Sequence, residues 1–167
     1  KALHDFIVAT FSYDTSVSES YDKASVSPYS MTRRGEGICG AYSGLMYQLL
    51  NAAGYRCRIL LKDTFARADD SIDAHAWNLV EIDGVWYHID ATWDDPVSDD
   101  GSDYMLHDFF LKSDVHMRRT HSWEKSAYPP APSSFPLSKA KAGKAPDKVY
   151  APVVDLTAVP ADLAGQN

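Results

Sequence analysis

The stretch AHAWNLVEIDGVWYHIDATW, residues 74–93, predicts a β-hairpin and fixes much of the fold around it. Apolar and polar residues alternate on both sides of Asp83 and Gly84, and an Asp-Gly pair between two such runs is typical of a two-residue hairpin turn. A two-residue turn pairs Ile82 with Val85 and so sets the pairs beyond; a four-residue loop keeps the same faces, whereas a three- or five-residue loop does not. The sequence therefore predicts a rigid antiparallel hairpin.

The hairpin register places His75 and Asp90 on one face. His75 is predicted opposite Thr92 and Asp90 opposite Trp77, so the two residues are diagonal neighbours about 7 Å apart at the backbone. An imidazole with a carboxylate behind it forms the base and the orienting group of a catalytic triad. The alternative interpretation is a partly buried, hydrogen-bonded histidine and an aspartate that caps the following turn.

Cys39 is predicted at the beginning of a helix. It lies in the Gly-rich run at residues 35–40, and the helix that follows has an apolar face and ends before Gly54. Unpaired N–H groups and the helix dipole at such a position stabilise a thiolate and can receive an oxyanion. The alternative is a small packing residue at a tight turn.

The remaining pattern predicts one α+β domain over residues 1–128 and a Pro-, Ala- and Lys-rich tail over residues 129–167, which serves as a linker or a strap. The further elements expected are an opening helix at 3–11, mainly loop at 12–36, a half-buried strand at 55–61 and a short strand within 104–114.

Composition narrows the function classes. The formal net charge is -7 and no basic stripe is present, so a nucleic-acid partner is not expected. No run reaches the roughly 20 apolar residues that cross a bilayer. The chain lacks an initiator Met and starts directly on a helix-like pattern, so we expect a piece of a longer protein.

Two cysteines are too few for a disulfide framework. A Cys39–Cys57 bridge is an alternative to a reactive Cys39, whereas the strand pattern favours Cys57 as a small buried residue.

Three motifs in order resemble the transglutaminase-like superfamily, and its bacterial branch most. They are G-x-C-x-x-Y-S at 37–43, H-A-W-N at 75–78 and W-Y-H-I-D-A-T-W-D-D at 86–95, and the resemblance covers about residues 35–96. It implies a papain-like core in which the nucleophile helix packs on an antiparallel sheet. It also implies Cys39 as nucleophile, His75 as general acid and base, and Asp90 as the residue that orients His75, with no cofactor.

Two further residues are candidates for substrate binding. Tyr29 lies upstream of Cys39, where related enzymes carry a side-chain donor for the oxyanion; simple loop packing is the alternative. Trp77 shares the hairpin face with His75, although strand aromatics more often belong to the core.

The sequence thus predicts acyl transfer on a peptide or carboxamide through a thioester, resolved by water in a protease or amidase, or by an amine in a transglutaminase. We expect a protein or peptide substrate and an extracytoplasmic, secreted or cell-surface location. One alternative is a catalytically inert transglutaminase-like binding domain. Another is a metalloenzyme in which His75, His88 and Asp90 hold the ion.

Overall fold

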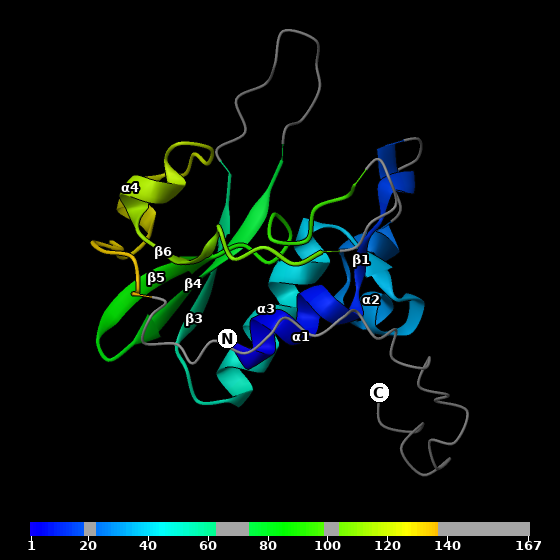
Figure 1. The fold of residues 1–167 in the computed structure, drawn as a ribbon, viewed down its shortest axis with the longest axis horizontal. Coiled ribbons are helices and arrows are strands. Elements are labelled where there is room, and N and C mark those ends of the chain that lie inside the picture. The colour runs from blue at the N-terminus through cyan, green and yellow to red at the C-terminus, as the bar shows by residue number, and fades with distance from the viewer. Residues whose placement is uncertain (19–22, 63–73, 99–103, 137–167) are drawn as a thin grey trace, which may run out of the picture.

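The computed structural model describes residues 1–18, 23–62, 74–98 and 104–136. A four-stranded antiparallel sheet of order β3-β4-β5-β6 lies at its centre (Figure 1). The helices are α1 (Ala2–Thr10), α2 (Pro28–Arg34), α3 (Cys39–Ala52) and α4 (Asp114–Met117). The strands are β1 (Ser12–Tyr13), β2 (Glu36–Gly37), β3 (Cys57–Leu61), β4 (Ala76–Ile82), β5 (Val85–Ile89) and β6 (Phe110–Lys112). In the described part of the chain, no helix has the length and apolar character needed to cross a bilayer.

The predicted hairpin is confirmed as β4 and β5. Asp83 and Gly84 have φ angles of 51° and 81°, the left-handed conformation that both central residues of a type I′ turn adopt. Leu79 lies opposite His88, as the turn requires. Strand pairing ends earlier than predicted, however: Asn78 and Ile89 form the last pair, and the predicted pairs Trp77–Asp90 and His75–Thr92 do not form.

Beyond the end of β5, the chain bonds to the segment before β6 instead of to β4. The register of β5 against β6 shifts between His88 and Ile89, and the N–H of Asp90 donates to the carbonyl of Phe109 at 3.1 Å. Asp90 therefore leaves the hairpin ladder and begins a turn directly after the strand.

The loop predicted over residues 12–36 is wrong in part, because it contains α2 and two short parallel strands. Ser27 caps α2 by accepting a hydrogen bond from the N–H of Ser30 at 3.3 Å, and Pro28 occupies the first helical turn. Gly35 ends the helix with φ of 81°. Both caps of α2 depend only on neighbouring residues, so the sequence contains the signals that predict this helix.

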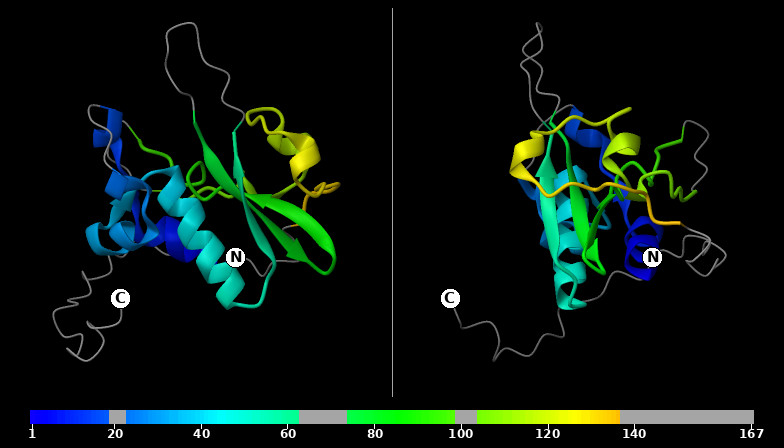
Figure 2. Two further views of the ribbon diagram at one scale, coloured as in Figure 1. Left: turned by 180° about the vertical axis from the view of Figure 1, so that it is seen from behind. Right: turned by 90° about the vertical axis from the view of Figure 1, so that its left-hand side faces the viewer.

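The sheet is covered on both faces, and the expected α+β architecture with the Cys39 helix packed on an antiparallel sheet is confirmed. Helices α1 and α3 share a core with one face, while α4 and the chain after it pack on the other (Figure 2). Strand β3 accordingly departs from simple alternation: Cys57 faces α3, Leu60 is buried in the second core, and Leu61 is 62% exposed.

The first residues of the predicted tail lie against the domain. The N–H of Asp114 donates to the carbonyl of Ala131 at 2.8 Å, and the N–H of Phe135 donates to the carbonyl of Leu111 at 2.9 Å. Ala131 is fully buried. Residues 137–167, the rest of the predicted tail, lie outside the described residues, and the boundary at residue 128 stays a prediction.

Candidate active site

The fold brings the three predicted site residues to one end of the sheet. Cys39 is the first residue of α3, His75 directly precedes β4, and Asp90 directly follows β5. Since β4 and β5 are antiparallel neighbours, the start of one lies beside the end of the other. The buried amide of Asn78 on β4 donates to the carbonyl of Ser43 on α3 at 3.0 Å, which holds the Cys39 helix against the hairpin.

His75 contacts both other residues. Its Nε2 lies 2.6 Å from Oδ2 of Asp90, which leaves Nδ1 for the side-chain hydrogen bond with Cys39. Burial of the ring opposes its protonation, but the hydrogen bonds to Asp90 and Cys39 outweigh burial and raise the pKa of His75 to about 9. At neutral pH the ring beside the Cys39 thiol is therefore an imidazolium.

Asp90 is a fully buried carboxylate with donors on both oxygens. The N–H groups of Thr92 and Trp93 donate to Oδ1 at 3.0 and 3.1 Å, whereas His75 and His121 lie against Oδ2. Burial alone would raise the pKa of Asp90, but the hydrogen bonds from His121 and His75 lower it. Asp90 is thus a charged, fixed acceptor behind His75.

His121 is the member of this cluster that sequence interpretation missed. Its Nε2 lies 2.9 Å from Oδ2 of Asp90, and its Nδ1 lies 2.8 Å from Oγ1 of Thr120. Because a carboxylate only accepts hydrogen bonds, a proton sits on Nε2 of His121 and points at Asp90. His121 follows α4, and no local motif places that segment over the hairpin.

Trp77 lies behind His75 rather than in an open groove. Its ring stacks on the imidazole at 5.7 Å and 18°, its Nε1 donates to Nδ1 of His88 at 3.0 Å, and only 1% of the residue is exposed. This burial removes Trp77 from any surface that a substrate could touch. The exposed aromatic of the site is Trp93, which is 40% exposed with its ring centroid 5.6 Å from that of His75.

Tyr29 lies on the surface of α2 and is 65% exposed. The contacts described for its side chain are with Arg33, which donates to the phenol oxygen at 3.3 Å and lies over the ring. Its part in an oxyanion site stays a prediction.

Two alternatives for the site residues, a Cys39–Cys57 disulfide and a metal site that includes His88, are not what the structure shows. Both cysteines are free, so the Cys39–Cys57 bridge does not form. Burial raises the pKa of Cys57 to about 12, which keeps that thiol protonated. His88 uses one ring nitrogen to accept from Trp77 and sets the other 2.8 Å from Asp114, so it does not join His75 in a metal site.

Comparison with known proteins agrees with this architecture. The family model described as the transglutaminase-like superfamily matches residues 1–91. Two curated relatives, the Kyphoscoliosis peptidases of Homo sapiens and Mus musculus, are each 26% identical over 99 residues, which is 56% of this chain. The chain spans 15% of the length of each of these relatives.

Two solved structures are similar to part of the chain. A candidate cysteine protease from Cytophaga hutchinsonii is 23% identical with a TM-score of 0.43, and the match covers 55% of this chain and 29% of that one. A protein named as a TGase is 18% identical with a TM-score of 0.44, and the match covers 59% of this chain and 28% of that one. On the family match over residues 1–91, the chain belongs to the transglutaminase-like superfamily.

Proposed function

We propose that this domain is a cysteine-nucleophile enzyme that transfers the acyl group of a peptide or carboxamide through a thioester. The observation that carries the proposal is the position of His75, which contacts Cys39 through one ring nitrogen and the buried Asp90 through the other. Cys39 is the proposed nucleophile, His75 the general acid and base, and Asp90 the positioning residue.

The first half of the reaction uses the thiolate form of Cys39. Its sulfur attacks the substrate carbonyl, and the N–H groups of Cys39 and Gly40 are suited to receive the oxyanion, since they precede Ala41 and Tyr42, whose N–H groups already donate to Ile38. The imidazolium of His75 then gives its proton to the departing amine as the carbon–nitrogen bond breaks. A thioester on Cys39 and a neutral His75 remain.

The second half regenerates the enzyme. Neutral His75 takes a proton from a water molecule or an amine, which attacks the thioester carbonyl; the Cys39 thiolate leaves and His75 is again charged. Water gives hydrolysis and an amine gives a new amide bond. We favour hydrolysis of a protein or peptide because the curated relatives carry the name peptidase. An extracytoplasmic or cell-surface location belongs to the same proposal and rests on the resemblance of the motifs to bacterial members.

The test compares the two thiols of one chain. Iodoacetamide near neutral pH should modify Cys39 rapidly. The labelling rate should fall in His75→Ala. It should not change in Cys57→Ser, because Cys57 is buried and protonated. Release of amines from a denatured protein substrate, measured with and without a fluorescent amine, then separates hydrolysis from transfer. A Cys39 that reacts no faster than a thiol in a denatured chain, and is indifferent to His75→Ala, would instead indicate an inert binding domain.

A further inference from the structure

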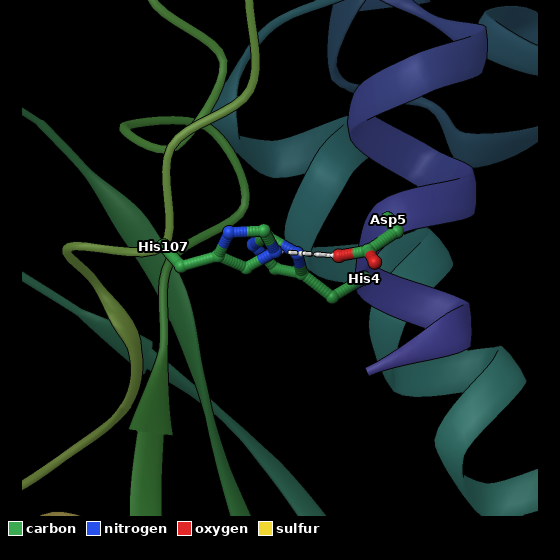
Figure 3. Close-up of side chains that lie close together, drawn as sticks. All are labelled: His4, Asp5 and His107. Carbon is green, nitrogen blue, oxygen red and sulfur yellow. Dashed lines mark hydrogen bonds and ion pairs between the residues drawn. The ribbon is translucent and has the colours of Figure 1, made fainter. Parts of the chain in front are cut away.

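A second cluster of ligating side chains lies where α1 meets the segment that leads into β6. Oδ1 of Asp5 lies 3.1 Å from Nδ1 of His4 and 2.7 Å from Nε2 of His107 (Figure 3). His4 is 1% exposed, while the side chains of Asp5 and His107 are 16% and 24% exposed. The His4 side of the cluster is therefore buried, whereas the side formed by Asp5 and His107 is partly exposed to solvent.

His4 is oriented by a contact on its far side. Its Nε2 lies 3.0 Å from Oδ2 of the fully buried Asp94, whose Oδ1 accepts the N–H of Phe109 at 3.0 Å. Because a carboxylate only accepts hydrogen bonds, a proton sits on Nε2 of His4. A metal-binding histidine is typically held in this way, with one nitrogen donating to a carboxylate and the other facing the ion.

The other ring nitrogen of His4 faces Asp5. Nδ1 of His4 and Oδ1 of Asp5 lie 3.1 Å apart, and each of these atoms can bind a metal ion. Nζ of Lys1 already supplies a cation to the outer side of the cluster, where it contacts Oδ2 of Asp5 and lies 3.1 Å from Nε2 of His107. Oδ1 of Asp5 is left between the two imidazoles.

We propose that His4, Asp5 and His107 form a site for a divalent transition-metal ion of the Zn²⁺ type. Zinc bonds of 2.0–2.1 Å in tetrahedral geometry separate neighbouring ligand atoms by about 3.3 Å. The two separations from Oδ1 of Asp5, 3.1 and 2.7 Å, must widen by about 0.2 and about 0.6 Å to reach that value, and all three ligand atoms lie within 4.8 Å of one another. Two imidazoles and one carboxylate suit zinc, and water can take the fourth position on the outer side once Nζ of Lys1 turns away from His107.

The bound ion has a structural role in this arrangement. Asp5 and His107 are 102 residues apart in sequence, so an ion between them closes a long loop. It fixes α1 to the segment before β6, and it binds on the opposite side of His4 from Asp94. The inference does not depend on the proposed acyl transfer.

The first experiment is equilibrium dialysis of the full chain against Zn²⁺ at neutral pH, with Co²⁺ as a spectroscopic probe. The chain should hold one equivalent that His107→Ala and Asp5→Asn each abolish. Co²⁺ in the chain should show the intense visible bands of a tetrahedral ion, and these should vanish in His107→Ala. Because His107 lies partly at the surface, its replacement leaves the folded core in place. Asp94→Asn keeps all three ligands and should weaken binding by about 10- to 100-fold.

Two control variants make the outcome decisive. His116→Ala removes a histidine outside the cluster, and His75→Ala removes a member of the other His-Asp-His group, formed with Asp90 and His121. Both should retain the equivalent. Absence of saturable binding at micromolar metal, equal binding by His107→Ala and the parent, or loss of the equivalent in His75→Ala would each overturn the proposal.

Discussion

Asp90→Asn changes the charge behind His75 with almost no change of shape. The asparagine Oδ1 can still accept from the N–H groups of Thr92 and Trp93, but its Nδ2 now faces His75 and His121 as a donor. Nε2 of His75 must then become an acceptor, and the proton of the neutral ring moves to Nδ1. That proton points at Cys39, so the ring can no longer take a proton from a nucleophile on that side.

The expected change in the free energy of unfolding follows from the pKa of His75, which rises from 6.5 to about 9. At about 1.4 kcal/mol per pKa unit, the charged ring gains about 3 kcal/mol from its partners in the folded protein. This stabilisation is complete below pH 6.5 and is lost as the pH rises through about 9. Asp90→Asn removes the contribution of Asp90 but keeps that of Cys39 and the opposing burial, so the pKa of His75 should fall well below 9.

The pKa is measured from the NMR titration of the His75 ring, assigned by comparison with His75→Gln. Urea denaturation at the two ends of the range gives the stability. From pH 6.5 to above pH 9, the parent should lose about 3 kcal/mol of its free energy of unfolding, and Asp90→Asn should lose less because only the contribution of Cys39 remains. With a substrate, kcat should fall by about 10⁴-fold, as it does when an orienting aspartate becomes asparagine in a serine-protease triad.

Asp114→Asn is the matched control, because Asp114 lies 2.8 Å from Nε2 of another buried histidine, His88. It should leave the titration of His75 unchanged. A pKa of His75 that stays near 9 in Asp90→Asn would refute the reasoning, since the charge of Asp90 would then not be what holds the proton.

Three smaller changes test other parts of the structure. Gly44→Ala places a Cβ 2.5 Å from Cγ of Pro28, so urea denaturation should show a loss of about 1–3 kcal/mol; an unchanged midpoint would mean that α2 moves freely from α3. His121→Ala removes a donor from the buried Asp90 and should lower the free energy of unfolding by about 1–3 kcal/mol. It should lower kcat more than it raises KM, and a change in KM alone would argue against a positioning role for His121. Trp93→Ala should raise KM several-fold and cost about 1–3 kcal/mol in urea denaturation, because the ring packs on Phe109 and His121; an unchanged KM would argue against a contact between Trp93 and the substrate.

The parts of the site that the sequence predicted are those that depend on local rules. Asp83 and Gly84 determine the turn, the period of two determines the faces, and together they place His75 and Asp90 at one end of the hairpin. The helix start at Cys39 follows from the glycines before it and the apolar face after it. Each of these inferences needs only the neighbouring residues.

The parts that were missed depend on contacts between distant segments. Trp77 does share the face of His75, but α4 and the chain after it cover that face, and Met117 and Trp123 pack there with Trp77. The same covering segment delivers His121 to Asp90. No periodicity in β4 reveals that a later segment seals it, so burial of Trp77 could not be inferred from the strand alone.

The turn after β5 explains why three aspartates lie so close together in the interior. Each buried carboxylate requires its own donors, and each finds them on a different element: Asp90 on His75 and His121, Asp94 on His4 of α1, and Asp95 on the hydroxyl of Tyr42 in α3 at 2.5 Å.

The turn is also closed on itself, since the N–H of Asp94 donates to the carbonyl of Asp90 at 3.2 Å. Two helices are thereby fixed to the short segment that holds His75 in place. We therefore expect a residue that anchors α1, such as His4, to affect the orientation of His75 through the position of this turn. Loss of its contact with Asp94 should therefore disturb the titration of His75 without any change to Cys39, His75 or Asp90 themselves.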